Sequence, residues 1–364
     1  MLAHSALFPP RPRGLKGRSA ELATLENLIA NTAPTRVALV GSGGSGKSML
    51  ACALGHRMAP FFGGRVHWFR VGAWDFSTLS EMFALRFGTA RGDARVRALR
   101  RFFRDAGPQL IVLDNHEEDR VTARLLEAFA DVPVTFVITA RRCLLAGVLI
   151  YPVTAPLVMS GSNAFPRVAQ LTRLLRFNPL ALDIADSIVA AGAETSAGLE
   201  TALRQKGVDR VVAIEHEDDL PEVALLVNWA WQRLSKESRS MLGVLAHVEG
   251  DHVDAASLAA LARVKRAPAR ALAPLLAFHL VQEPAPGRFT LHAVVRHAVK
   301  RRARPAHERV FEHYVSLLER EPERLLLEQT HLFSAMDHAH RTNNLNAMLR
   351  VDELLKRLDA EGAG

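Results

Sequence analysis

A glycine-rich run that ends in a lysine and a serine has the residue types and spacing that hold a phosphate chain. It comprises Gly41, Ser42, Gly43, Gly44, Ser45, Gly46, Lys47 and Ser48, and Met49 follows it. Glycines let the backbone curl tightly enough to aim successive N–H groups at one anion. In this pattern the lysine reaches the β- and γ-phosphates, and the serine hydroxyl ligates Mg²⁺. The run therefore predicts a nucleoside triphosphate site with Mg²⁺.

The flanking residues place this loop between a strand and a helix. The apolar residues 37–40 come directly before it, and the helix-prone residues 49–54 come directly after it. This order is the context that a phosphate-binding P-loop requires, and the helix adds its positive N-terminal dipole. The alternative interpretation is a glycine linker before a helix, which does not account for the strand.

A second apolar run, residues 109–114, ends in the carboxylate of Asp114. In P-loop proteins such a strand is the Walker B element, whose acid holds Mg²⁺ at the edge of the sheet. We therefore expect Ser48 and Asp114 to be the metal ligands. Glu117 follows closely and is a candidate general base for an attacking water. The alternative for Glu117 is an exposed position at a helix start.

A third apolar run, residues 134–139, is followed by Arg141 and Arg142. An arginine at the carboxyl end of a strand, beside the triphosphate, can neutralise the γ-phosphate. We favour Arg141 for this role over Arg142. The alternative is that Arg141 is a surface arginine.

These residues need a parallel sheet to bring them together. Strand and helix signals alternate through the first half of the chain, a pattern that favours such a sheet with helices on both faces. The expected strands are 36–40, 65–71, 109–114, 134–139 and 148–153. The expected helices are 48–58, 77–87, 93–105 and 121–130.

From about residue 156 onward β signals become rare. Residues 168–191 read as helices interrupted at Asn178-Pro179, and residues 225–248 read as a helix pair. A short β-like run follows the Pro286-Gly287 turn, which suggests a winged-helix unit near residues 221–303. The tail from Ala306 to Leu358 is helical in pattern.

Composition excludes several classes of protein. Only two cysteines occur among 364 residues, so a disulfide framework and a cysteine-rich zinc site are not expected. No apolar run reaches the roughly 20 residues of a membrane span, and the first residues do not resemble a secretory signal. We therefore expect a cytoplasmic protein without a membrane partner.

The net charge of +8 favours acidic partners. Two groups of cations stand out, and either could neutralise nucleic-acid phosphates; solvated arginine-rich helix faces are the alternative. The first group is Arg97, Arg100, Arg101 and Arg104, and the second is Arg296, Lys300, Arg301, Arg302 and Arg304.

Six motifs resemble those of the STAND class of signal-transducing P-loop ATPases, in the order in which that class has them. The class includes the NB-ARC proteins and many bacterial regulators. The motifs are Gly17-Arg18-Ser-Ala-Glu21-Leu22, the glycine-rich loop, Val112-Leu-Asp114-Asn115-His-Glu117, Thr139-Ala-Arg141, Phe177-Asn-Pro179-Leu-Ala-Leu182 and Leu291-His292-Ala293-Val-Val-Arg296.

The resemblance implies ATP or ADP as the nucleotide and adds three residues to its site, Arg18, Pro179 and His292. The resemblance implies that this histidine touches the β-phosphate of ADP and holds a closed state. Ala293 replaces the aspartate that usually follows this histidine, which implies a weaker lock. A histidine packed within the winged helix is the alternative for His292.

Together these features predict an α/β P-loop NTPase followed by an all-α lid, a winged-helix domain and a helical tail. The expected boundaries are an N-terminal extension at 1–13, the nucleotide-binding domain at 14–155, the lid at 156–220, the winged helix at 221–303 and the tail, a possible start of repeats, at 304–364.

The resemblance implies a nucleotide-operated switch, closed with ADP and open with ATP, in which slow ATP hydrolysis is the reset. A protein effector on another chain and a homo-oligomer formed on activation are the expected partners. A nucleic-acid-binding regulator and an AAA-type remodelling ATPase are the alternatives, and nucleic acid is the less favoured partner.

Overall fold

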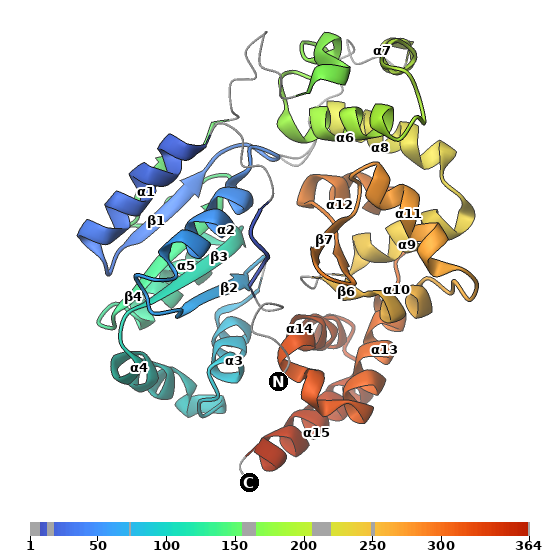
Figure 1. Cartoon of the computed structure of the whole chain (residues 1–364). Coiled ribbons are helices and arrows are strands. Elements are labelled where there is room, and N and C mark those ends of the chain that lie inside the picture. The colour runs from blue at the N-terminus through green and yellow to red at the C-terminus, as the bar shows by residue number, and fades with distance from the viewer. Residues whose placement is uncertain are drawn as a thin grey trace. The chain divides into compact units, whose positions relative to one another are not determined.

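The computed structural model describes residues 8–12, 18–72, 74–154, 165–205, 220–248 and 252–362. The chain forms two compact units (Figure 1). The first comprises Met1–Ala164 and Phe177–Leu180, and the second comprises Phe165–Arg176 and Ala181–Gly364.

A five-stranded parallel sheet forms the centre of the first unit, with the strand order β2-β3-β4-β1-β5. Its strands are β1 (Arg36–Val40), β2 (Val66–Arg70), β3 (Gln109–His116), β4 (Val134–Ala140) and β5 (Leu149–Pro152). Its helices are α1 (Ser19–Thr32), α2 (Lys47–Met58), α3 (Phe76–Arg86), α4 (Arg95–Ala106) and α5 (Asp119–Ala128), with a 3₁₀ turn at Gly92–Ala94. The parallel five-stranded sheet expected from the sequence is thus confirmed.

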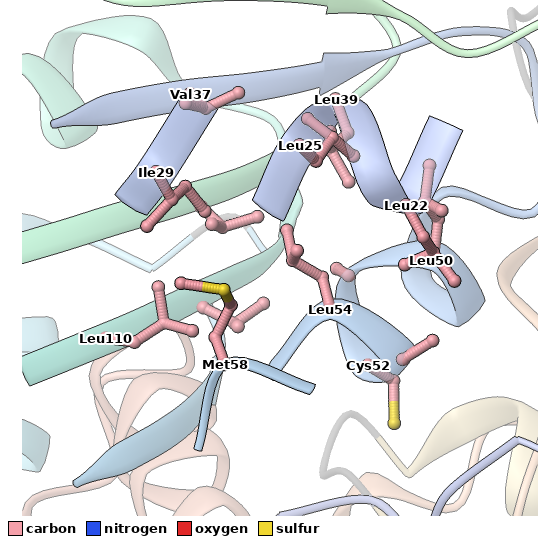
Figure 2. Packing of buried hydrophobic residues seen from close by; sticks show 14 of the residues in the cluster. Leu22, Leu25, Ile29, Val37, Leu39, Leu50, Cys52, Leu54, Met58 and Leu110 are labelled. Carbon is pink, nitrogen blue, oxygen red and sulfur yellow. The ribbon is translucent and has the colours of Figure 1, made fainter. Parts of the chain in front are cut away.

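Apolar side chains from α1 and α2 cover one face of the sheet. Figure 2 shows Leu25 of α1 and Leu54 of α2 converging with Leu39 of β1. All three are fully buried. Burying a leucine contributes about 1.5–3 kcal/mol, so this cluster anchors the helix that carries the P-loop lysine to the sheet.

Aromatic side chains cover the opposite face. Trp68 belongs to the core shared with α2, whereas its neighbour Phe69 packs on Phe83 of α3 with ring centroids 4.1 Å apart. Adjacent residues of a strand point to opposite faces. Phe83 also stacks on Phe129, and Phe103 of α4 packs edge-on against Phe129. Helices therefore lie on both faces of the sheet.

The second unit is mostly helical. The helix α6 (Pro179–Ala190) belongs to this unit from residue 181 onward, because its first two residues belong to the first unit. The other helices are α7 (Ser196–Gln205), α8 (Pro221–Arg233), α9 (Lys236–His247), α10 (Ala255–Leu261), α11 (Pro268–Ala277), α12 (Ala293–Lys300), α13 (His307–Arg320), α14 (Leu325–Arg341) and α15 (Leu345–Gly362), with 3₁₀ turns at Pro166–Leu171 and Pro322–Arg324. A small antiparallel sheet has the order β6-β8-β7, formed by β6 (Val253–Asp254), β7 (Gln282–Ala285) and β8 (Arg288–Thr290).

A buried ionic cluster joins this small sheet to α14. Glu328 is fully buried and accepts hydrogen bonds from Arg288 (2.8 Å) and Arg324 (2.7 Å). Arg324 also donates to Asp254 at 2.7 Å. Burial opposes ionisation of Asp254, but hydrogen bonds from Ser257 and the charge of Arg324 outweigh it and lower its pKa to about 2. The cluster therefore neutralises its own charges.

Candidate functional site

The glycine-rich loop joins the end of β1 to the start of α2. Gly41 donates its N–H to the carbonyl of Ala140 at 3.2 Å. A Cβ on Gly41 would lie 2.1 Å from the carbonyl oxygen of Val153, so no larger residue fits there. Gly44 (φ 75°) and Gly46 (φ 90°) adopt left-handed backbone conformations, which favour glycine. The loop therefore needs glycine at these positions to keep its curl.

Lys47 opens α2 and folds back over the loop. Its Nζ donates to the carbonyls of Gly41 (2.8 Å) and Ser42 (2.7 Å). Burial, and to a smaller extent the charge of Arg141, lower the pKa of Lys47 to about 8 against the opposing effect of Asp114. The ammonium is thus held at the centre of the loop in surroundings that make its charge costly, which an incoming anion would relieve.

Ser48, Asp114 and Thr139 form one hydrogen-bonded group beside the loop. The Oδ1 atom of Asp114 accepts from Ser48 Oγ at 2.7 Å and from Thr139 Oγ1 at 2.6 Å. Thr139 is buried, and its Oγ1 also accepts from the N–H of Asn115 at 2.9 Å. The structure therefore brings together the two predicted metal ligands and adds a threonine that fixes the carboxylate.

Thr139 is a site residue that sequence reasoning missed, because it was noted only as part of a motif. The available signal was its position: Thr139 is the penultimate residue of β4, and β4 lies directly beside β3. Carboxyl ends of adjacent parallel strands meet at one edge of a sheet, where ligands of α/β proteins bind. That rule would have placed Thr139 beside Asp114.

The predicted general base, Glu117, is exposed and is held by its neighbour. Asn115 donates from Nδ2 to Glu117 Oε1 at 2.7 Å, and its own backbone is left-handed with φ 59°. The register of β3 and β4 shifts between Leu113 and His116. Such an irregularity re-aims the side chains that follow a strand. Glu117 follows this irregularity directly and is exposed.

His116, the last residue of β3, joins the end of this strand to α5. It is buried, and its ring nitrogens lie 2.8 Å from Thr122 Oγ1 and 2.8 Å from Asp119 Oδ1. Both partners belong to α5, so the imidazole ties the end of β3 to the first turn of the next helix. This contact fixes the backbone from which Glu117 projects.

Arg141 and Arg142 differ in their surroundings. Arg141 is partly buried, and its charge acts on Lys47, whereas Arg142 is exposed. The preference for Arg141 as the arginine near the loop is consistent with this placement.

Arg18 is buried and forms hydrogen bonds to the backbone of the loop. Its Nη2 donates to the carbonyl of Ser45 at 2.5 Å and to the carbonyl of Thr154 at 2.8 Å, and its Nη1 pairs with Glu21 at 2.5 Å. These bonds give Arg18 a positioning role: it joins the loop to the residues that follow β5. The preceding Gly17 lies outside the described residues.

Residues 177–180 pack against the loop from a distant part of the sequence. A Cβ on Gly44 would lie 3.2 Å from Leu180 Cβ and 3.3 Å from Asn178 Oδ1. Pro179 is the first residue of α6, a position that suits its fixed φ. The structure thus brings the Asn178-Pro179 motif to the loop, while Met49 lies half-exposed on the first turn of α2.

His292 belongs to the second unit, where it caps a helix. Its Nδ1 accepts from the N–H of Val294 at 3.3 Å, as the N-cap of α12. A side chain at this position satisfies one N–H of the first helical turn.

The N-terminal segment lies along α2. Phe8 packs edge-on against His56 and Trp68, and a Cβ on Gly55 would lie 2.5 Å from its ring. Burial, and to a smaller extent the charge of Asp114, raise the pKa of Cys52 to about 12. Cys52 is therefore a packing residue and not a nucleophile.

Within the described ranges, no group of three or more His, Cys, Asp or Glu side chains is arranged to hold a metal ion. The same part of the chain contains no helix that is long and apolar enough to cross a membrane.

No protein-family model matches the sequence, and no curated protein matches it. Among solved structures, the chain is similar to a signal transduction ATPase with numerous domains (STAND) that has a tetratricopeptide repeat sensor, from Pyrococcus horikoshii. The TM-score is 0.61 at 17% identity, over 98% of this chain and 54% of that one. The chain thus spans about half the length of that protein.

Two further similarities have lower scores. The Orc1 protein of Aeropyrum pernix in complex with DNA has a TM-score of 0.32 at 16% identity, over 82% of this chain and 96% of that one. Cdc6p of Pyrobaculum aerophilum has a TM-score of 0.34 at 14% identity, over 83% and 99%. At these scores the likeness adds nothing about fold or function. The sheet, the loop and the first similarity together show that this chain has the fold of a P-loop ATPase.

Proposed function

We propose that the protein is an ATP- and ADP-operated switch of the STAND type, with slow ATP hydrolysis as its reset. The observation that carries this proposal is the group formed by Ser48, Asp114 and Thr139 beside the glycine-rich loop. The likeness in fold to a STAND protein supports the class. A switch requires that two nucleotides bind two states with different free energies.

The loop provides the phosphate site. Left-handed glycines and the start of α2 direct backbone N–H groups and a helix dipole toward one anion. Lys47 adds a positive charge whose pKa of about 8 rises when a phosphate chain approaches. Arg141 lies close enough to influence that lysine, which supports a role beside the γ-phosphate.

The residues beside the loop fit a magnesium ion. A serine hydroxyl and a carboxylate 2.7 Å apart are the two protein ligands that P-loop proteins use. When bound, Mg²⁺ neutralises charge on the phosphate oxygens. Ser48 and Asp114 would hold it, and Thr139 would keep the carboxylate oriented.

Glu117 is the proposed general base, which takes a proton from the attacking water. Asn115 fixes its carboxylate by one hydrogen bond, while the rest of the side chain is exposed. An exposed base is poorly pre-organised, which is consistent with slow hydrolysis.

The second unit would respond to the nucleotide. The order α9, β6, α10, α11, β7, β8 with the sheet order β6-β8-β7 supports a winged-helix domain here.

We propose that His292, at the start of α12, senses bound ADP. Its capping bond uses Nδ1 as the acceptor, so the proton of a neutral ring resides on Nε2.

The first test is the identity of the nucleotide that the protein carries. The purified protein would be denatured and the released nucleotide separated by chromatography. Near-stoichiometric ADP is the expected result and supports a closed, ADP-held switch. An empty protein that hydrolyses added ATP rapidly would instead support an AAA-type remodelling ATPase.

A second test addresses the metal ligands. In Asp114→Asn the hydrogen bond from Ser48 can persist, but the charge that holds Mg²⁺ is lost. We expect Mg²⁺-dependent hydrolysis to fall at least about 100-fold while ATP still binds. Equal hydrolysis rates for this variant and the parent would refute the role of Asp114.

A further inference from the structure

Four exposed cations lie on the turn between α10 and α11 and on the first turn of α11. They are Arg263, Lys265, Arg266 and Arg270. Among the residues that the structure describes, no carboxylate forms an ion pair with any of them. Like charges gathered without counter-charges create a local positive potential.

The two cation groups noted in the sequence are used differently. Arg100 and Arg104 both pair with Asp131, and Arg296 donates to the carbonyls of Leu245 and Val248. Several side chains of these two groups therefore already donate hydrogen bonds to other parts of the fold. Within the described residues, the side chains of Arg263, Lys265, Arg266 and Arg270 form no such hydrogen bonds.

The segment that carries these cations exposes no large apolar side chain. Ala267, Pro268 and Ala269 separate the charged residues, and all three are exposed. The exposed large hydrophobic side chains of the described residues all lie elsewhere. Protein interfaces depend on buried aromatic and aliphatic anchors, whereas binding to a phosphate backbone depends on cations. The composition therefore favours nucleic acid over an acidic protein.

The order of the elements around these cations matches that of a helix-turn-helix followed by a hairpin. α10 and α11 are consecutive helices joined by residues 262–267, and α11 precedes the β7–β8 hairpin (Figure 1). In helix-turn-helix proteins the second helix enters the major groove with its N-terminal residues foremost. No side chain caps the start of α11, so its positive dipole adds to the four cations.

We propose that the α10–α11 turn and the start of α11 bind the phosphate backbone of duplex nucleic acid. The four cations supply the affinity through counterion release, and the helix start provides a further phosphate contact. This surface belongs to the second unit and uses none of the nucleotide-site residues. It therefore adds a partner to the proposed switch without depending on nucleotide hydrolysis.

The test measures binding of a fluorescent 20-base-pair DNA duplex by anisotropy at several salt concentrations. Four neutralised phosphates predict that parent affinity falls about 100-fold between 50 and 200 mM salt. The variant Arg263→Gln, Lys265→Gln, Arg266→Gln, Arg270→Gln should bind at least tenfold more weakly at 50 mM salt. Its logarithmic salt slope should be smaller by about 3 to 4.

A matched control removes four exposed positive charges elsewhere, by Arg97→Gln, Arg101→Gln, Arg301→Gln and Arg304→Gln. Both variants lower the net charge from +8 to +4, since 8 − 4 = 4. The control should keep the parent's salt slope to within about one unit. Equal losses in both variants, or parental binding by the first variant, would overturn the proposal.

Two more measurements separate this inference from its rivals. A polyglutamate peptide of equal charge should compete weakly with the duplex; strong competition would point to an acidic protein partner and overturn the assignment. The first variant should bind ATP as the parent does, because it leaves the loop intact. A failure of duplex binding and a failure of nucleotide binding can therefore be distinguished.

Discussion

The P-loop site and the buried ionic cluster both gather charged side chains, but they satisfy them in opposite ways. In the cluster, Glu328 is enclosed between two arginines, so the charges cancel within the fold. At the loop, Lys47 bonds to backbone carbonyls, and its pKa lies below the ordinary value. A charge that the fold leaves partly unbalanced suits a charged ligand, whereas a balanced one serves architecture.

Removing one charge from the cluster should produce the largest change, in the free energy of unfolding. Glu328→Gln keeps the side chain's shape but leaves Arg288 and Arg324 with one fewer counter-charge in a buried site. We expect unfolding of the second unit to become easier by about 3–5 kcal/mol. Urea unfolding checks this, with ATP affinity expected to stay near the parent value.

A surface pair provides the control for that variant. Glu312 pairs with Arg350 at 2.8 Å and is 57% exposed. Removing its charge by Glu312→Gln should cost about 0–1 kcal/mol. A similar cost for both variants would mean that the cluster does not depend on burial.

At the loop, the same kind of change should affect binding rather than stability. Lys47→Ala removes the ammonium that meets the phosphates, so ATP affinity should fall at least about 100-fold. Calorimetry measures the affinity, and thermal unfolding without nucleotide serves as the comparison. Unchanged ATP affinity would remove Lys47 from the site.

Thr139→Val tests the residue that sequence reasoning missed. It deletes the hydroxyl that donates to Asp114 and accepts from the N–H of Asn115. An unsatisfied buried group costs about 1–3 kcal/mol, so we expect about a tenfold lower rate of ATP hydrolysis. Thr139→Ser retains the hydroxyl and should recover most of the rate. A rate that the serine does not restore would point to packing instead.

The smallest expected effect is a pH dependence of nucleotide binding. Burial and Arg141 hold the pKa of Lys47 at about 8, below its ordinary 10.5. We expect a bound phosphate chain to raise this pKa, because a nearby negative charge favours the ammonium. Below pH 8 the lysine is charged with or without ATP. Above pH 8 it must take up a proton on binding, so affinity should fall by up to about tenfold per pH unit.

Calorimetry in buffers of different ionisation enthalpy would measure that proton uptake between pH 8 and pH 10.

Asp254, in the ionic cluster, has a pH dependence of the opposite sign, and it affects stability rather than nucleotide binding. Its pKa of about 2 lies below the ordinary 3.8, so its contribution to stability is present above pH 4 and is lost as the pH falls toward 2.

The sequence predicted which residues meet at the glycine-rich loop better than which residues form the cluster, for a physical reason. Residues of the loop are contiguous, and Asp114 ends an apolar strand, so local patterns reveal them. Most of the strands follow from continuous apolar runs of the kind buried on both faces of a sheet, whereas the edge strand β5 is mostly exposed. Each predicted strand overlaps an observed one within two residues at either end.

The remaining contacts depend on convergence from distant positions. Asp254, Arg288 and Glu328 are separated by tens of residues, and none of them belongs to a recognisable motif. Arg18, which the resemblance implies at the nucleotide site, donates hydrogen bonds to the backbone carbonyls of Ser45 in the loop and of Thr154. Such roles are set by tertiary packing, which local patterns do not encode.

The division of the chain at residues 177–180 bears on how such a protein could be taken apart. Residues up to 164 belong to the first unit and residues 165–176 to the second. Residues 177–180 belong to the first unit again, beside Gly44, and the second unit resumes at residue 181 within α6. No single cut can therefore release both units whole. A truncation at residue 164 would keep the sheet and the loop but lose Asn178 and Pro179. An exchange of either unit for a homologous one would therefore have to carry this four-residue segment with the first unit.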